Sequence, residues 1–150
     1  MPGNIVTLNV PAEYGYVIMA ASASFLLNTI HGVFTVQARK KSGLGYPVSY
    51  ADKALADKDP NAYAFNCAQR AHANFTENHT SVLAALLISG LRTPVASASL
   101  GAVWVLSRAI YAKMYSSGGP KARVLGILGH YLTAYPLIVM AAYTGWAMTR

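Results

Sequence analysis

The sequence is poor in charge, and its acidic residues are particularly few. Charged residues make up 11% of the 150-residue chain, whereas soluble domains average about 25%. Five residues are acidic and twelve are lysine or arginine, so the formal net charge is +7. So low a charged fraction, beside a hydrophobic fraction of 54%, argues against an ordinary soluble domain and indicates residence in a membrane.

Cysteine is also scarce, as are the usual signatures of cofactor binding. The single cysteine, Cys67, excludes an internal disulfide and a cysteine-rich metal site, and we expect it to pack as a small apolar residue. His31, His79 and His130 lack the spacing of metal ligands, so we predict no metal site and expect these rings to pack in the core or at an interface. The sequence has no glycine-rich phosphate loop, low-complexity tract or internal repeat.

Long apolar segments are what the sequence does contain. Four of them are long enough to cross a hydrocarbon layer of roughly 30 Å. They predict an all-α fold, a four-transmembrane-helix bundle that forms a single integral membrane domain over residues 1–150, with no separate soluble catalytic domain. The predicted spans cover about 14–38, 65–90, 94–115 and 125–147. The first has no preceding lysine or arginine and is longer than the apolar part of a signal peptide, so we do not expect it to be cleaved.

The basic residues are distributed unevenly between the predicted loops. Seven lie in the first and third loops, namely Arg39, Lys40, Lys41, Lys53, Lys58, Lys121 and Arg123. Only Arg92 and Arg150 lie on the other side. The positive-inside rule therefore predicts that the first and third loops are cytosolic and that both termini lie across the membrane. Because the positive charge follows the membrane topology in this way, nucleic acid is not a predicted partner.

The second predicted helix carries a polar face that is costly in a membrane. Arg70, Asn74 and Glu77 fall within roughly 60° of one another on a helix, and each charge costs about 2.5–3.5 kcal/mol on insertion scales. A guanidinium suits a carboxylate, a carboxylate suits an ammonium group, and an amide can donate and accept. The set therefore fits a zwitterionic, peptide-like ligand. The alternative is an internal ion pair between Arg70 and Glu77, through Asn74 or a neighbouring chain.

A second polar face, on the third predicted helix, is expected to lie beside the first. Trp104, Arg108, Tyr111 and Tyr115 share one face by their spacing. The short link of residues 91–93 makes the second and third helices antiparallel neighbours. The polar ends of the two helices then coincide near the cytosolic interface, which predicts one shared polar site.

These two motifs, Arg70-x-x-x-Asn74-x-x-Glu77 and Arg108-x-x-Tyr111-x-x-x-Tyr115, resemble the MAPEG family, the membrane-associated proteins in eicosanoid and glutathione metabolism. The likeness extends from about Pro11 to Trp146. Its further matches are Glu13-Tyr14-Gly15, Ala38-Arg39-Lys40-Lys41, Tyr46-Pro47, Phe65-Asn66-Cys67 and Gln69-Arg70-Ala71-His72. The resemblance implies a homotrimer of four-helix subunits in the endoplasmic reticulum membrane, with the nuclear envelope and the outer mitochondrial membrane as alternatives.

The resemblance also implies that glutathione is the co-substrate, held between neighbouring subunits near the cytosolic face. The matching positions that would bind it are Arg39, Arg70, His72, Asn74, Glu77, Tyr111 and Tyr115. In one member, leukotriene C4 synthase, an arginine near the start of the fourth helix approaches the thiol. Arg123 is our choice for that catalytic role, and Lys121 is the second choice. Asn78 departs from the pattern, because leukotriene C4 synthase has a tyrosine there.

The implied chemistry is that of an enzyme acting on lipophilic substrates from the bilayer. A free thiol with a pKa near 8.5 is mostly protonated at neutral pH, and a guanidinium stabilises the reactive thiolate. We therefore expect a glutathione transferase with glutathione-dependent peroxidase activity toward lipophilic electrophiles or lipid hydroperoxides. The alternatives are a non-catalytic lipid-binding scaffold of the same family and a small transporter or channel. The intact polar motif favours the enzyme, and the sequence lacks the inverted repeats and broken helices of many transporters.

Overall fold

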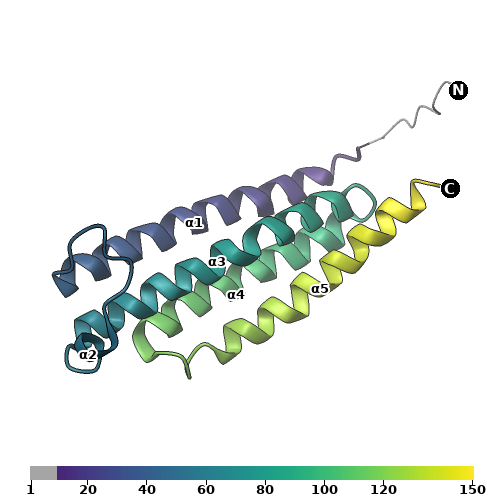
Figure 1. The fold of residues 1–150 in the computed structure, drawn as a ribbon. Coiled ribbons are helices and arrows are strands. Elements are labelled where there is room, and N and C mark those ends of the chain that lie inside the picture. The colour runs from purple at the N-terminus through teal and green to yellow at the C-terminus, as the bar shows by residue number, and fades with distance from the viewer. Residues whose placement is uncertain (1–9) are drawn as a thin grey trace, which may run out of the picture.

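The computed structural model describes residues 10–150, which form helices and connecting loops. The long helices are α1 (Tyr14–Ser42), α3 (Pro60–Gly90), α4 (Pro94–Gly118) and α5 (Val124–Ala147), and a single turn, α2 (Lys53–Ala56), lies in the first loop. The long helices run alternately up and down in an elongated bundle (Figure 1). No strand occurs between residues 10 and 150, which confirms the all-α prediction.

The helices extend beyond the predicted spans at the end of the bundle that carries the basic loops. α1 ends at Ser42 instead of about residue 38, and α3 begins at Pro60 instead of about residue 65. Hydropathy marks only the apolar part of a helix, whereas the ends are set by local capping. The Asp59 side chain accepts a hydrogen bond from the Asn61 amide at 2.8 Å, and Pro60 needs no hydrogen-bond partner at the start of a helix.

The first loop is more ordered than the sequence suggests. Its glycines and prolines predict irregular structure, but Asp52 caps the short helix α2 by accepting a hydrogen bond from the Leu55 amide at 2.8 Å. Gly43 ends α1 in the left-handed region at φ 68°, a conformation that a glycine adopts without steric cost. The loop therefore turns back over the end of the bundle instead of extending away from it (Figure 1).

Three of the helices in the described part of the chain, α1, α4 and α5, are long and apolar enough to cross a membrane. α3 is the longest, at 31 residues, but its polar face lowers its hydropathy. Figure 1 shows α3 running beside the other three along the bundle. The membrane character is thus supported, and a fourth crossing by α3 stays a prediction.

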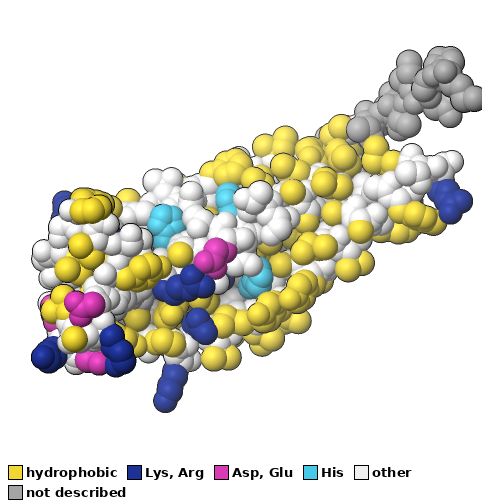
Figure 2. Space-filling view, viewed as in Figure 1, with side chains coloured by type: hydrophobic (Ala, Val, Ile, Leu, Met, Phe, Trp, Pro, Cys, Tyr) yellow, Lys and Arg dark blue, Asp and Glu magenta, His cyan; other side chains and the backbone are white. Residues whose placement is uncertain are grey.

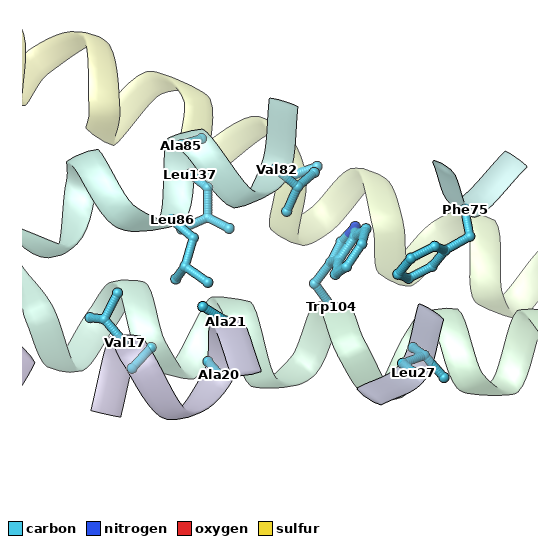
Figure 3. Close-up of a cluster of buried hydrophobic side chains, with 12 residues drawn as sticks. Val17, Ala20, Ala21, Leu27, Phe75, Val82, Ala85, Leu86, Trp104 and Leu137 are labelled. Atoms are coloured by element: carbon cyan, nitrogen blue, oxygen red, sulfur yellow. The ribbon is translucent and has the colours of Figure 1, made fainter. Parts of the chain in front are cut away.

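The bundle core lies around α3 and α4, each of which packs against both α1 and α5. Phe75 from α3, Trp104 from α4 and Leu137 from α5 are almost fully buried in this core (Figure 3). Phe75 also packs against the rings of His31 and His79, with centroid distances of 4.8 and 4.9 Å. The packing role predicted for these two histidines is confirmed.

Two glycines bring α5 against α4 at the polar end of the core. A Cβ atom added at Gly126 would lie 2.5 Å from the Cβ of Tyr111, and one added at Gly129 would lie 2.5 Å from the Cβ of Ser107. Only a residue without a side chain permits so close an approach. The same contacts place the first turns of α5 beside the polar faces of α3 and α4.

Candidate functional site

A polar cavity of about 290 Å³ lies between α3, α4 and α5. Its lining residues are Arg70, Asn74, Asn78, Arg108, Tyr111, Arg123, Ile127, His130 and Tyr131. Figure 2 shows basic, acidic and histidine side chains gathered midway along the bundle, in addition to the charged side chains at the end that carries the basic loops. Four residues of the predicted site, Arg70, Asn74, Tyr111 and Arg123, are thus brought together by three different helices.

Arg70 and Glu77 form a direct ion pair at the edge of this cavity. Arg70 Nη1 donates to Glu77 Oε1 at 2.8 Å, and Nη2 donates to Oε2 at 3.2 Å. This contact agrees with the alternative prediction, an ion pair within the protein. The pair is bidentate, however, and does not pass through Asn74. The two side chains are 45% and 50% exposed, and such exposed pairs contribute about 0–1 kcal/mol. A ligand that carries both an anion and a cation can therefore replace the pair at little cost.

Arg108 is a buried cation without an acidic partner. Its side chain is 1% exposed, Nη2 donates to Asn74 Oδ1 at 2.8 Å, and the guanidinium lies 4.2 Å from the ring centroid of Tyr111. Its Nε has no hydrogen-bond partner, and no carboxylate within residues 10–150 pairs with it. A buried charge is costly unless it is paired, and a cation–π contact offsets only part of that cost. This cation therefore favours an anion in the cavity.

The first turns of α5 supply the opposite wall. Arg123 precedes the helix directly, and its guanidinium lies 5.3 Å from the ring centroid of Tyr115. Lys121 does not line the cavity, so the structure places Arg123, and not Lys121, beside the other polar residues. About two helical turns further along, His130 accepts a hydrogen bond at Nδ1 from Trp104 Nε1 at 2.9 Å.

A neighbouring cavity of about 380 Å³ is lined by Arg70, which also lines the first cavity, and by Tyr115. Tyr115 packs edge-on against Tyr111, with ring centroids 5.5 Å apart. Cys67 also borders this second cavity but is itself buried, which confirms the expectation that it packs as a small residue. Arg70, which lines both cavities, and the contact between the two tyrosines therefore connect the two cavities.

A model of one known protein family matches most of this chain. The model described as the MAPEG family matches residues 17–143. The chain belongs to the MAPEG family. The match includes both polar motifs and all the residues that line the polar cavity. The family includes glutathione transferases and peroxidases, as well as other members.

Two residues that the MAPEG pattern predicts at the site lie elsewhere in this subunit. Arg39 is buried between the rings of Tyr46 and Phe65 and donates to the Val48 carbonyl at 2.6 Å, so it holds the first loop against α1 and α3. His72 Nε2 lies 3.2 Å from Asn28 Oδ1 on α1. Neither lines the polar cavity, because Arg39 belongs to α1 and His72 faces α1 from α3.

Several cavity residues are absent from the predicted set of glutathione-binding and catalytic residues. Arg108 shares a helical face with Tyr111, and Asn78 follows Asn74 by one turn, so the sequence did contain a signal for both. Asn78 Nδ2 donates to the Asn74 backbone carbonyl at 2.7 Å. His130 and Tyr131 were not assigned to the site, because α5 carries no charged residue that would mark a polar face. His130 was predicted to be a packing residue, and its contact with Trp104 agrees with that prediction. The position of His130 in the cavity wall was not predicted.

Proposed function

We propose that the protein is a membrane-bound glutathione transferase with glutathione-dependent peroxidase activity. The observation that carries the proposal is the charge of the polar cavity. Three guanidinium groups, of Arg70, Arg108 and Arg123, line it without an acidic residue, and Glu77 lies at its edge. Glutathione in its thiolate form offers the complementary set of two carboxylates, one thiolate and one ammonium group. Membership in the MAPEG family supports this ligand, because the family includes glutathione transferases and peroxidases.

The proposed roles follow from the contacts of each side chain. Glutathione replaces the Arg70–Glu77 ion pair by giving a carboxylate to Arg70 and its ammonium group to Glu77. Asn74 and the hydroxyl groups of Tyr111 and Tyr115 provide further hydrogen bonds. Arg123 is the proposed catalytic cation, which favours the thiolate by lowering the pKa of the bound thiol. The mechanism uses the sulfur of glutathione, so it requires neither a metal ion nor Cys67.

The proposed assembly is a homotrimer in which a neighbouring subunit completes the pocket. The cavity volume of about 290 Å³ is just below the range of roughly 300–1,000 Å³ that is typical of ligand sites. Arg39 and His72, which face away from this cavity, would contact glutathione held mainly by the adjacent subunit. The motifs resemble those of microsomal glutathione S-transferase 3, which supports an endoplasmic reticulum location with the first and third loops in the cytosol.

The second substrate is proposed to be a lipophilic electrophile or a lipid hydroperoxide that enters from the bilayer. An apolar groove of about 520 Å³ between α1 and α4 is lined by Met19, Ala23, Ala102, Leu106 and neighbouring residues. Such a surface suits an acyl chain. The same groove supports the second candidate function, a non-catalytic lipid-binding scaffold of the family.

Glutathione binding followed by turnover tests the proposal. The purified protein would be titrated with glutathione in a calorimeter and then assayed with a fatty-acid hydroperoxide and with chlorodinitrobenzene. Saturable binding together with turnover supports the enzyme. Lipid binding without glutathione binding or turnover would instead support the scaffold.

A further inference from the structure

His130 presents a fixed hydrogen-bond donor in the wall of the polar cavity. Its Nδ1 accepts a hydrogen bond from Trp104 Nε1 at 2.9 Å, and Trp104 is held in the core with 1% exposure. An indole N–H can only donate, so Nδ1 carries a lone pair and the proton of the imidazole is on Nε2. The two ring nitrogens point in nearly opposite directions. The Nε2–H group is therefore directed away from Trp104.

The backbone around His130 holds this ring in position. Gly129 packs directly against Ser107 of α4, and the Thr133 hydroxyl donates to the Gly129 carbonyl at 2.7 Å. Within residues 10–150, no acceptor forms a hydrogen bond with His130 Nε2. The donor is therefore positioned by the fold but has no partner in this subunit.

Arg108 lines the same cavity and has unused donors of its own. Nη2 is occupied by Asn74, Nε is buried without a hydrogen-bond partner, and Nη1 forms no hydrogen bond with any described residue. A cation and a fixed neutral donor thus share a cavity whose lining residues include no carboxylate. Such preorganised groups stabilise a negative charge that develops on an oxygen atom during a reaction.

We propose that His130, together with Arg108, stabilises the oxygen that leaves when a hydroperoxide is cleaved. The proposal rests on the proposed function, because glutathione must supply the attacking thiolate. The sulfur attacks the distal oxygen of the hydroperoxide, a sulfur–oxygen bond forms, and the oxygen–oxygen bond breaks. The electron pair of the broken bond goes to the proximal oxygen, which leaves as an alkoxide and takes a proton from water. The hydroxide ion that remains combines with the proton released when the first glutathione thiol ionised.

The remaining steps balance without any further reagent. The first glutathione is oxidised to its sulfenic acid, and the hydroperoxide is reduced to an alcohol. The thiol of a second glutathione then displaces the sulfenic oxygen, which gives glutathione disulfide and water. His130 keeps its proton throughout and acts by hydrogen bonding to the developing alkoxide. This role is specific to the peroxidase reaction, because transfer of glutathione to chlorodinitrobenzene places the charge on the aromatic ring and expels chloride.

Two substitutions separate the donor from the packing of His130. In His130→Asn the amide oxygen can still accept from Trp104, but the donor toward the cavity is lost. In His130→Gln the longer side chain can return an N–H group to the position of Nε2. Each variant would be assayed as the full-length purified protein with an alkyl hydroperoxide, a peroxy acid and chlorodinitrobenzene. A peroxy acid expels a carboxylate, which is a stable anion and needs little assistance.

The expected result is a loss of activity that depends on the leaving oxygen. Removal of one such donor typically lowers kcat by about 10²–10³, so His130→Asn should lose about this factor with the alkyl hydroperoxide. It should keep near-normal rates with the other two substrates, and His130→Gln should recover part of the lost activity. The ratio of the rates for two substrates in one preparation is independent of the fraction of folded protein.

Three outcomes would overturn the inference. Equal losses with the alkyl hydroperoxide and the peroxy acid would make His130 a structural residue, and an unchanged alkyl hydroperoxide rate would leave it no role. In either of these cases an active wild-type protein would keep the proposed function intact. A wild-type protein that neither binds glutathione in the calorimeter nor reduces the alkyl hydroperoxide would overturn both proposals.

Discussion

Replacing Arg70 by alanine should weaken glutathione binding through the loss of a bidentate carboxylate contact. Truncating one partner of a hydrogen-bonded charge pair typically costs about 2–5 kcal/mol. Part of this cost is offset, because the variant has no Arg70–Glu77 ion pair to break before glutathione binds. In the unsubstituted protein the two hydrogen bonds of that pair are 2.8 and 3.2 Å long. That half-exposed pair contributes about 0–1 kcal/mol. The net loss should therefore be about 1–5 kcal/mol, with a central value near 3 kcal/mol or roughly 100-fold in Kd.

Isothermal calorimetry on the purified variant measures this change directly. Arg92→Ala is a suitable control, because Arg92 lies at the opposite end of the bundle, 5.2 Å from the ring centroid of Tyr143. It should bind glutathione as the wild type does. Thermal unfolding should be nearly the same for all three proteins, since the ion pair removed by Arg70→Ala is half exposed. A folded Arg70→Ala variant with wild-type affinity would show that the Arg70–Glu77 pair is purely structural.

Further predictions concern the thiol, the topology and the packing of α5. Arg123→Leu should reduce the ultraviolet thiolate absorbance of bound glutathione more than it reduces glutathione binding, because other groups hold the peptide. If only Lys121→Leu loses this absorbance, Lys121 and not Arg123 stabilises the thiolate. A cysteine introduced into the first loop should react with an impermeant reagent in sealed right-side-out microsomes, and labelling only after permeabilisation would invert the topology. Gly126→Ala should lower the free energy of unfolding by about 1–3 kcal/mol, because the added Cβ would lie 2.5 Å from the Cβ of Tyr111. Chemical denaturation measures this change, and unaltered stability would mean that α4 and α5 can move apart without cost.

The sequence predicted the helical architecture well because hydropathy and helical periodicity both depend on local patterns. Pro94 illustrates this, since a proline after a short polar link is expected to begin a helix and does so. The ends of α1 and α3 were predicted less well. The segments around Lys41 and Pro60 are polar but remain helical, because helix formation depends on capping and propensity as well as on burial.

The candidate site was predictable where one helix carries the pattern. Spacing along α3 and α4 indicated that Arg70, Asn74 and Tyr111 share a polar region, and the structure brings them to one cavity. The direct contact between Arg70 and Glu77 depends on side-chain conformation, which spacing does not determine. His130 could not be identified in this way, because its place in the cavity depends on the approach of α5 to α4 at Gly129.

The place of Arg39 shows a second limit of sequence reasoning. Its match to the MAPEG pattern implied a contact with glutathione, but its guanidinium lies 4.3 and 4.5 Å from the ring centroids of Tyr46 and Phe65. This arrangement depends on the path of the loop between α1 and α3. A role for Arg39 in the pocket of an adjacent subunit stays a prediction.

We propose above all that the polar cavity binds glutathione and stabilises its thiolate. Ultraviolet difference spectroscopy during a glutathione titration at neutral pH tests both parts at once. We predict a saturable thiolate absorbance that disappears when S-methylglutathione, which has no ionisable thiol, displaces the bound ligand. A titration of the folded wild-type protein that produces no thiolate absorbance at saturating glutathione would contradict the claim.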